Sequence, residues 1–306
     1  MKILLLGGNQ FLGRAISQKL IDLNYDLYLL NRGNRENPMG AKFIKSDRDN
    51  YYELDVALKD LSVDIIIDIS GYTPLQIENI YKIMKNKFKQ YIYISSASIY
   101  NNIQSFPIKE TETTGQNPIW GEYAKNKFLS EQKILELSSE CNYTIFRPFY
   151  IYGIGNNLDR ESYIFSRIIN NLSIFLPNKG EEIVQFGYID DLVEAILYSI
   201  NNPDFYNGIF NISGDESVTF NNYVKICAKI VSKKADIKYI NLENTGLKAR
   251  DWFPFRDTHL FGSIDKIKSV GFKNKYDLFD GLNKTYKYLE ENNLLHYPQL
   301  HEIEKV

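Results

Sequence analysis

Three side chains in the middle of the chain have the types and spacing needed to move a proton and a hydride together. Tyr123 and Lys127 are four residues apart in an expected helix and therefore share one of its faces. A phenol with a pKa near 10 is a poor base at neutral pH, but a nearby ammonium and an oxidised nicotinamide both favour the phenolate. Tyr123 could then take a proton from an alcohol while hydride leaves its carbon. Ser96 would hold the same oxygen in line.

A glycine-rich segment near the start of the chain could hold a dinucleotide. GGNQFLG, residues 7–13, follows a short apolar run and opens a stretch with helical periodicity. Glycines let the backbone approach an anion closely, and the free N–H groups at a helix N-terminus attract a pyrophosphate. The segment therefore favours a dinucleotide site over a plain strand-to-helix turn.

The residues after the second expected strand indicate which dinucleotide is bound. An acidic side chain there binds the ribose hydroxyls and repels a 2′-phosphate. This chain has neutral Asn31, followed by Arg32 and Arg35, and arginine pairs well with phosphate. We expect NAD or NADP, with a slight preference for NADP, although two solvated loop arginines would give the same pattern. Asp47, after the third expected strand, could accept a hydrogen bond from the adenine amine.

The expected cofactor contacts fall mostly where strands end or the first helix begins. They are Gly7, Asn9, Gln10, Phe11, Leu12, Gly13, Asn31, Arg32, Arg35, Asp47, Ser70, Gly71, Tyr123, Lys127 and Pro148. Ligands of open parallel sheets bind outside the carboxyl ends of the strands. The site therefore requires a sheet whose strand ends meet at one edge.

Alternating apolar runs and amphipathic stretches supply such a sheet. The expected strands are Lys2–Leu6, Asp26–Leu30, Lys42–Ile44, Val63–Ile69, Gln90–Ser95, Thr144–Phe146 and Gly208–Ile212. The expected helices are Phe11–Leu23, Tyr52–Leu61, Leu75–Lys87, Tyr123–Glu140, Asp190–Ile200 and Phe220–Val231. This alternation predicts an α/β fold, a Rossmann doubly wound parallel sheet with a smaller C-terminal substrate-binding subdomain.

The expected domains are not continuous in the sequence. An NAD(P)-binding Rossmann domain covers residues 1–152, and residues 180–213 return to it. Residues 153–179 and 214–306 form a substrate-binding cap over the strand ends.

The composition argues against several other classes of protein. A net charge of −2 gives no basic surplus for nucleic acid or an anionic membrane. Two distant cysteines and three histidines offer neither a disulfide framework nor an obvious metal site. No apolar run approaches the roughly 20 residues that span a bilayer. We expect a cytoplasmic protein with no metal and no membrane partner.

The motifs GGNQFLG, SSASIY, YAKNK and RPFYIYG together resemble the extended short-chain dehydrogenases/reductases, which include the NAD-dependent epimerases and dehydratases. In that family the active serine stands four residues before the tyrosine of the strand-end motif, which selects Ser96. The tyrosine and lysine of its YxxxK motif correspond to Tyr123 and Lys127. The resemblance thus implies that these three residues are catalytic.

A more specific resemblance covers most of the chain. SDRD, IDISGY, FNISGDESVTF and the segment 253–282 are similar to the chloroplast stem-loop RNA-binding proteins and their bacterial relatives, an atypical branch of the same superfamily. The plant members are associated with RNA, whereas many bacterial relatives are labelled as epimerases or dehydratases. This chain keeps Tyr123, which RNA binding alone would not require.

The family resemblance also suggests how a nucleotide-sugar would be held. Tyr150 and Val184 occupy places where relatives carry diphosphate contacts, while Arg160 and Arg256 could grip phosphate or form surface salt bridges. The expected substrate contacts are Ser98, Tyr150, Arg160, Gln185 and Arg256. Ala97-Ser98 replaces the Asp-Glu pair of the sugar dehydratases, which favours an epimerase or a keto-reductase.

Three functions follow from these observations. The first is an NAD(P)-dependent epimerase or keto-reductase that acts on a nucleotide-sugar or a similar carbonyl compound. The second is an RNA-binding protein or ribonuclease on a dinucleotide-binding fold, which the negative charge disfavours. The third is a cofactor-sensing regulator. Family precedent also implies a homodimer through Leu75–Lys87 and Tyr123–Glu140, although such amphipathic helices serve a core equally well.

Overall fold

Seven parallel strands form the central sheet, in a computed structural model that describes residues 1–139 and 141–305. The strand order is β10-β6-β5-β4-β1-β2-β3, and every neighbouring pair is parallel. These strands are β1 (Lys2–Leu6), β2 (Asp26–Asn31), β3 (Lys42–Lys45), β4 (Ile65–Asp68), β5 (Gln90–Ile94), β6 (Asn142–Pro148) and β10 (Gly208–Ile212). The central strands β4 and β5 are buried along their whole length, as expected when helices cover both faces. The predicted fold class is confirmed.

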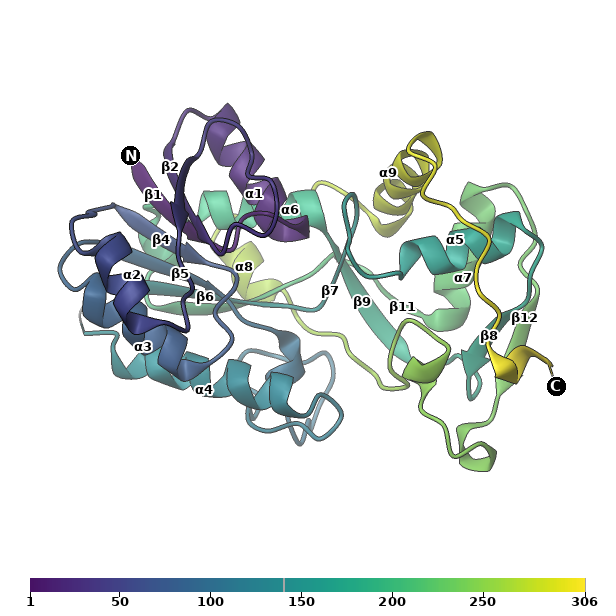
Figure 1. Cartoon of the computed structure of the whole chain (residues 1–306). Helices are drawn as coiled ribbons and strands as arrows, with labels where there is room; N and C mark the ends of the chain where they lie inside the picture. The colour runs from purple at the N-terminus through teal and green to yellow at the C-terminus, as the bar shows by residue number, and fades with distance from the viewer. Residues whose placement is uncertain (140, 306) are drawn as a thin grey trace. The chain divides into compact units, whose positions relative to one another are not determined.

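Helices lie on both faces of this sheet (Figure 1). They are α1 (Phe11–Asp22), α2 (Tyr51–Leu58), α3 (Pro74–Ile83), α4 (Glu122–Glu136), α6 (Ile189–Tyr198) and the short α8 (Asp265–Ser269). In Figure 1 α2, α3 and α4 lie below the sheet, and α1 lies above it. The core between the lower helices and the sheet is formed by Leu54, Leu58, Ile77, Ile80, Tyr81, Met84 and Ile134 against Leu4, Leu6, Ile66, Tyr91, Tyr93 and Ile145.

Local sequence explains where two of these helices begin. Pro74 occupies the first turn of α3, and Thr73 and Gln76 form a capping box that satisfies its first N–H groups. Helix α4 begins after Gly121, whose φ of 58° favours glycine. The helix predicted up to Glu140 ends at Glu136, and Glu140 itself lies outside the described residues.

The chain divides into two compact units. The first comprises Met1–Phe149, Leu192–Ile212 and Gly262–Lys273; the second comprises Tyr150–Asp191, Ser213–Phe261 and Asn274–Val306. Segment 180–191, which the sequence assigned to the Rossmann domain, belongs to the second unit. The division into a cofactor-binding domain and a substrate-binding cap stays a prediction.

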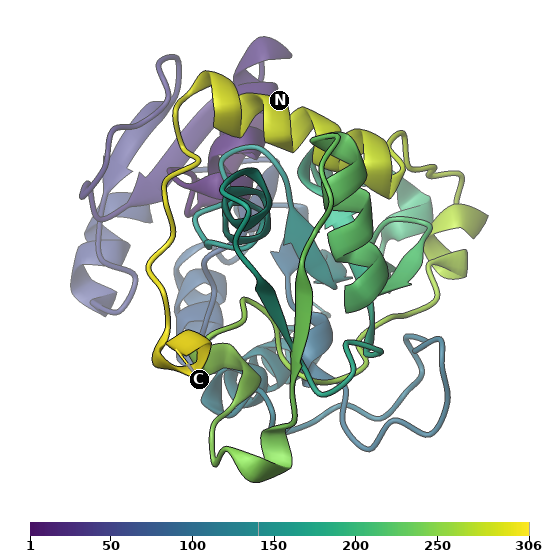
Figure 2. The same cartoon turned by 90° about the vertical axis from the view of Figure 1, so that its right-hand side faces the viewer.

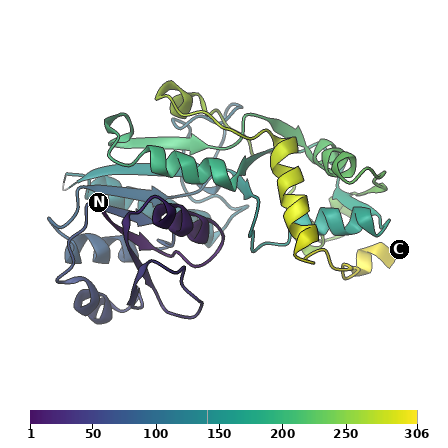
Figure 3. The ribbon, with the colours of Figure 1, turned by 90° about the horizontal axis from the view of Figure 1, so that it is seen from above.

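The second unit has two small sheets and three helices among its described residues. One sheet has the order β11-β9-β7 and the other pairs β12 with β8. Their bounds are β7 (Tyr150–Tyr152), β8 (Ile174–Pro177), β9 (Ile183–Tyr188), β11 (Ser217–Thr219) and β12 (Ile237–Ile240). The helices α5 (Glu161–Ile169), α7 (Phe220–Ile230) and α9 (Leu278–Glu291) pack against one another (Figures 2 and 3).

Short 3₁₀ turns complete the description. They are η1 (Ala97–Ile99), η2 (Pro203–Phe205), η3 (Leu242–Asn244), η4 (Ala249–Asp251) and η5 (Glu302–Lys305). Of these, η1 directly follows β5 and contacts α4, so it brings two candidate catalytic segments together.

Candidate active site

The loop between β1 and α1 needs glycine at two places. Gly7 has a φ of 91°, and a Cβ there would lie 2.6 Å from the Cβ of Ser70. A Cβ on Gly13 would lie 2.1 Å from the carbonyl oxygen of Gly7. Gln10 has a φ of −142°, which is extended backbone that any residue adopts. The left-handed residue is instead Phe11, with a φ of 42°.

This loop borders a pocket of about 680 Å³ within the first unit. The lining residues are Gly7, Gly8, Asn9, Gln10, Leu30, Asn31, Arg32, Asn34, Arg35, Ser46, Asp47, Arg48, Asp49, Ser70 and Gln76. Eight of the predicted cofactor contacts are among them: Gly7, Asn9, Gln10, Asn31, Arg32, Arg35, Asp47 and Ser70. The other predicted contacts, Phe11, Leu12, Gly13, Gly71, Tyr123, Lys127 and Pro148, do not line it.

Asn31 ties the two loops of the pocket together. Its amide donates to the side-chain oxygens of Asn9 at 3.0 Å and Asn37 at 2.9 Å. Its side-chain oxygen accepts from the backbone of Gly33 at 2.8 Å. Arg32 and Arg35 are exposed beside it. The pocket therefore combines a neutral amide at the end of β2 with two cations facing solvent.

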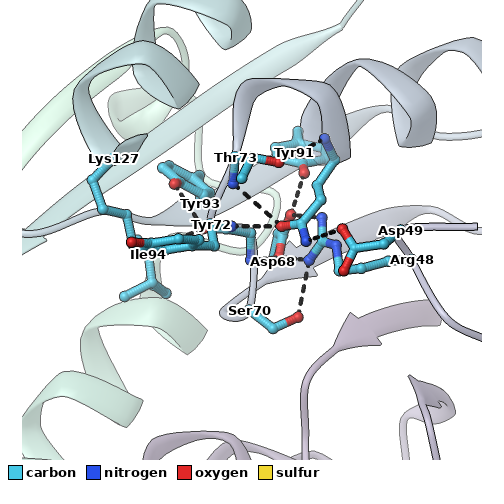
Figure 4. A network of polar contacts seen from close by, with 12 residues as sticks. Arg48, Asp49, Asp68, Ser70, Tyr72, Thr73, Tyr91, Tyr93, Ile94 and Lys127 are labelled. Atoms are coloured by element: carbon cyan, nitrogen blue, oxygen red, sulfur yellow. Dashed lines mark hydrogen bonds and ion pairs between the residues drawn. The ribbon is translucent and has the colours of Figure 1, made fainter. Parts of the chain in front are cut away.

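A buried ion pair beneath the pocket was not predicted from the sequence. Arg48 donates through both terminal nitrogens to the two carboxylate oxygens of Asp68, each at 2.8 Å (Figure 4). Asp68 also accepts from the Tyr91 hydroxyl at 2.6 Å and from the Gly71 backbone at 2.7 Å. Arg48 donates further to the Ser70 hydroxyl at 2.9 Å. A charged residue ending the apolar strand IIID was the available signal, because a buried carboxylate requires a partner.

The pair holds both of its members in the charged form. Burial alone would raise the pKa of the Asp68 carboxyl, but the Arg48 guanidinium outweighs it and the pKa is lowered. Burial likewise opposes the charge on Arg48, while Asp68 raises the pKa of that guanidinium above its usual value. The Nε of Arg48 and the hydroxyl of Ser46 are buried in this region, and neither has a hydrogen-bond partner among residues 1–139 and 141–305.

Lys127 lies buried on α4 next to this pair. Its ammonium donates to the carbonyl oxygens of Gly71 at 2.8 Å and Ile94 at 2.7 Å, and lies 4.7 Å from the centre of the Tyr93 ring. Burial lowers the pKa of Lys127 to about 8, because an ammonium loses its hydration there, although Asp68 attracts the charge. Lys127 is therefore a cation that can lose its proton near neutral pH.

The other two candidate catalytic residues are more accessible. Tyr123, one helical turn before Lys127, is 41% exposed, and its ring centre lies 6.1 Å from that of Tyr72 in a stacked arrangement. Ser96 is half-buried after β5, and its hydroxyl accepts from the Ser98 backbone at 3.1 Å. Ser98 itself is buried, and its hydroxyl has no hydrogen-bond partner in the described part of the chain.

A second buried ion pair includes Glu131, four residues after Lys127 on the same helix. Arg147 donates to the two carboxylate oxygens of Glu131 at 2.6 and 3.0 Å. Burial opposes the charge of Arg147, but Glu131 raises its pKa above the usual value. Arg147 also donates to the Tyr100 hydroxyl at 3.1 Å, and that hydroxyl donates to Asn211 at 2.6 Å.

The second unit gathers arginines around an aromatic cluster. The Arg160 guanidinium lies 4.9 Å from the centre of the Tyr150 ring and 5.6 Å from that of Phe255. Burial lowers the pKa of Arg160, and Arg250 lowers it further by repulsion. Arg256 is also lowered in pKa by burial, with Arg250 and Arg160 nearby. Among residues 1–139 and 141–305, no carboxylate forms an ion pair with Arg160 or Arg250.

Two further buried side chains of the second unit are Gln185, which was predicted as a substrate contact, and Glu161, which was not predicted. Gln185 is buried and donates to the Gly214 carbonyl at 2.7 Å. Glu161, which begins α5, is buried and accepts from the Asn156 amide at 2.9 Å. Burial raises the pKa of the Glu161 carboxyl to about 7, because the amide and the Arg160 charge compensate it only in part.

Searches for two other kinds of site were negative within the described part of the chain. No group of three or more His, Cys, Asp or Glu side chains is arranged to hold a metal ion there. None of the helices in that part is both long and apolar enough to cross a membrane.

Comparison with known proteins places these features in context. Residues 3–213 match the model of the NAD dependent epimerase/dehydratase family. The chloroplast stem-loop binding protein of 41 kDa b from Arabidopsis thaliana is 32% identical over 304 residues, which cover 93% of this chain and 78% of that protein.

Solved structures share the fold at low identity. A UDP-glucose 4-epimerase from Thermotoga maritima, solved with UDP-glucose, has a TM-score of 0.81 at 19% identity, covering 96% of this chain and 100% of that one. A UDP-glucuronic acid 4-epimerase from Bacillus cereus, solved with UDP-glucuronic acid and NAD, has a TM-score of 0.77 at 19% identity, covering 95% and 100%.

Proposed function

Because the chain belongs to the NAD-dependent epimerase/dehydratase family, a family of enzymes, we propose that it epimerises or reduces a nucleotide-sugar through Ser96, Tyr123 and Lys127. The observation that carries this proposal is the setting of Lys127. Its buried ammonium is fixed by the carbonyls of Gly71 and Ile94, one helical turn from an exposed tyrosine. A lysine that served only as a surface charge would not be held in this way.

The residues of the first unit fit a nicotinamide dinucleotide. A side chain on Gly7 would clash with Ser70, and one on Gly13 would clash with the Gly7 carbonyl, so these glycines allow the tight backbone turn at the start of α1. The buried Nε of Arg48 and hydroxyl of Ser46 offer polar groups without a protein partner. The pyrophosphate would rest on residues 7–13, and the adenosine end would meet Asn31, Arg32, Arg35 and Asp47. The nicotinamide, when bound, supplies a reversible hydride acceptor.

Each catalytic side chain has a distinct role in this proposal. Ser96 donates a hydrogen bond to the sugar oxygen and holds it beside Tyr123. The phenolate oxygen of Tyr123 takes the proton of that sugar hydroxyl as hydride leaves the carbon that bears the hydroxyl, and the phenol returns the proton in the reverse direction. When the phenol of Tyr123 has lost its proton, the Lys127 ammonium attracts the resulting negative charge. Together they move one proton for each hydride.

The arginines of the second unit would hold the diphosphate of the nucleotide-sugar. Arg160 and Arg256 were predicted as phosphate contacts, and Arg250 lies close enough to repel both. Their mutual repulsion falls when an anion binds between them, which favours a diphosphate. Tyr150 and Phe255 form the aromatic support of Arg160. Ser98 and Gln185 complete the proposed substrate contacts.

We propose NADP as the preferred cofactor, on a smaller set of observations. The residue at the end of β2 is the neutral Asn31, and both of its amide hydrogens are used within the protein. Arg32 and Arg35 are exposed at the rim of the pocket, where a 2′-phosphate would meet two cations.

Replacing Tyr123 tests the proposed chemistry. Tyr123→Phe should lower the rate of UDP-glucose or UDP-glucuronate conversion by about 10²–10⁴-fold, since proton transfer is lost while the ring remains. NMR of the sugar products measures this rate. Tyr52→Phe, which removes a hydroxyl from an 82% exposed tyrosine on α2, is the matched control and should keep the activity. Full activity of Tyr123→Phe would contradict the proposed chemistry.

An RNA-binding function is the second candidate, and one observation favours it: the 32% identity with a plant protein named for stem-loop binding. The net charge of −2 weighs against it, because phosphate neutralisation by cations supplies most nonspecific affinity for RNA. A gel shift with structured RNA that weakens as salt increases would support this alternative. No binding near physiological salt would exclude it.

A further inference from the structure

Lys127 on α4 lies near two buried ion pairs, and one of them is joined to it through a single residue, Gly71. Asp68 accepts from the N–H of Gly71 at 2.7 Å, and the carbonyl of the same glycine accepts from Lys127 at 2.8 Å. Tyr93 donates to that carbonyl as well, at 2.9 Å. Figure 4 shows Asp68 with Arg48 on one side and with Tyr93 and Lys127 on the other.

We propose that Arg48 and Asp68 are positioning residues for Lys127: they hold the Gly71 carbonyl against its ammonium, and the balance of their charges decides how readily Lys127 loses its proton. This inference rests on the proposed function only for the catalytic use of Lys127. Neither residue of the pair needs to touch the substrate.

The turn that transmits the effect has little freedom to move. A Cβ added to Gly71 would lie 2.6 Å from the Asp68 carboxylate, 2.8 Å from Ile77 and 2.9 Å from Tyr93. Asp68 is fully buried and accepts from four donors: two guanidinium nitrogens, one backbone N–H and the Tyr91 hydroxyl. A carboxylate bonded in this way fixes the backbone that follows it.

The charges that face Lys127 come as two compensated pairs. Asp68 and Arg48 face it from the ends of β4 and β3, and Glu131 from its own helix. Glu131 is neutralised by Arg147 of β6. Tyr93 of β5 contributes its ring, and Tyr123 lies one turn away. On the neighbouring helix α3, Glu78 interacts with Lys82 and Lys133 instead.

Because the two members of the pair carry opposite charges, their removal must act on Lys127 in opposite directions. Asp68 raises the pKa of Lys127 and Arg48 lowers it, on top of the larger lowering by burial. Asp68→Asn leaves Arg48 uncompensated and should lower the pKa of Lys127. Arg48→Gln leaves Asp68 uncompensated and should raise it. A purely structural role would not produce shifts of opposite sign.

NMR titration of the protein labelled with ¹³C at the lysine ε-carbon tests this directly. The Lys127 signal is the one lost in Lys127→Met. We expect its midpoint to fall by about 1 pH unit in Asp68→Asn and to rise by about 1 pH unit in Arg48→Gln. The double variant Arg48→Gln/Asp68→Asn should titrate near the unchanged protein. Tyr91→Phe, which removes one hydrogen bond to Asp68 without changing charge, should shift the midpoint less than either single variant.

The possible results separate this inference from the proposed function. Shifts of the same sign in both single variants, or no shift in Arg48→Gln, would overturn the inference. If Asp68→Asn does not fold, Arg48→Gln and the double variant still test the inference. The Lys127 midpoint must rise in Arg48→Gln and must return to that of the unchanged protein in the double variant. If Lys127→Met keeps full activity with UDP-sugars, the proposed function fails while the titration still tests the pair. If both the inference and the proposed function are correct, the pH profile of kcat/KM should shift in each variant by the same amount as the measured Lys127 midpoint.

Discussion

The two units of the chain differ in how their buried charged side chains are paired. In the first unit Arg48 and Arg147 each form a bidentate ion pair with a buried carboxylate, and each has a raised pKa. In the second unit Arg160 lies against aromatic rings and forms no ion pair with a carboxylate of the described residues, and burial lowers its pKa. The carboxylates differ in the same sense, since the pKa of Asp68 is lowered and that of Glu161 is raised to about 7.

The difference indicates what each region is built to do. A compensated pair presents almost no net charge, so it fixes backbone and side chains without attracting an ion from solution. An arginine without a carboxylate keeps its attraction for an incoming anion and gains from its binding. On the proposed function, the first unit would use arginine to position its own residues, whereas Arg160 of the second unit would serve a ligand.

The largest effect is expected when the ion pair between Arg48 and Asp68 is broken. Asp68→Asn should lower the free energy of unfolding by about 3–5 kcal/mol, because it leaves the Arg48 charge buried without its partner. Urea denaturation followed by circular dichroism measures the change. The double variant Arg48→Met/Asp68→Leu, which removes both charges, should recover most of the loss. A loss below about 1 kcal/mol in Asp68→Asn would remove the contrast between the units.

The second test concerns the carboxyl of Glu161, whose burial is compensated only in part. Its pKa of about 7 in the folded protein lies above the ordinary value of 4.5, so the folded state binds more protons than the unfolded state between these pH values. The stability that this group contributes is therefore full below about pH 4.5 and lost as the pH rises through 7.

Glu161→Gln should remove this dependence and be more stable than the unchanged protein at pH 8, by up to about 3 kcal/mol. Denaturation curves at a series of pH values measure the slope. Glu291→Gln, at an exposed glutamate on α9, is the control and should leave the slope as it was. An unchanged slope in Glu161→Gln would show that another group is responsible.

The third test asks whether the arginines of the second unit serve a ligand. Arg160→Met should change stability by less than about 1 kcal/mol, because no ion pair is lost. It should weaken UDP-glucose binding about tenfold, the amount expected for one charged hydrogen bond. Calorimetric titration measures the affinity. Lys225→Met removes an exposed cation from α7 of the same unit and should leave binding unchanged. Loss of stability without loss of affinity would reverse the interpretation.

The smallest effect is expected at the exposed arginines of the first unit, which are neither buried with a carboxylate nor buried without one. Arg35→Gln should reduce the preference for NADP over NAD by a few-fold, about 1 kcal/mol or less, because an exposed charge is screened by solvent. Fluorescence titration with the two reduced cofactors measures the ratio. Arg14→Gln, an exposed arginine of α1 outside the pocket, should leave the ratio unchanged. No change in Arg35→Gln would favour NAD.

Much of the first unit could be predicted from local patterns. The strands β1, β2, β4 and β5 are apolar runs between polar turns, and the predicted strand positions agree with them to within a few residues. The short strands β7, β8, β9, β11 and β12 were not predicted. Strands of three or four residues, such as β7 and β11, carry too little periodicity to stand out, and their pairing joins distant parts of the chain.

The candidate site divides in the same way. The residues of the glycine loop, and likewise Tyr123 and Lys127, lie close together in the sequence, so both motifs could be recognised from it. Arg48 and Gln76 line the pocket as well, but a single arginine in a loop or a single glutamine in the first turn of a helix carries no signal of its own. Arg250 escaped notice for the same reason, since only packing brings it near Arg160.

The sequence by itself determined the parallel sheet, its glycine loop and the four-residue spacing on α4, because periodicity and turn chemistry act between near neighbours. Only the tertiary structure decided which charges meet. Arg48 follows β3 and Asp68 ends β4, and β1 and β2 lie between these strands in the sheet. Whether a buried charge is compensated depends on such distant contacts, and the ionisation of Lys127, Asp68 and Glu161 depends on it in turn.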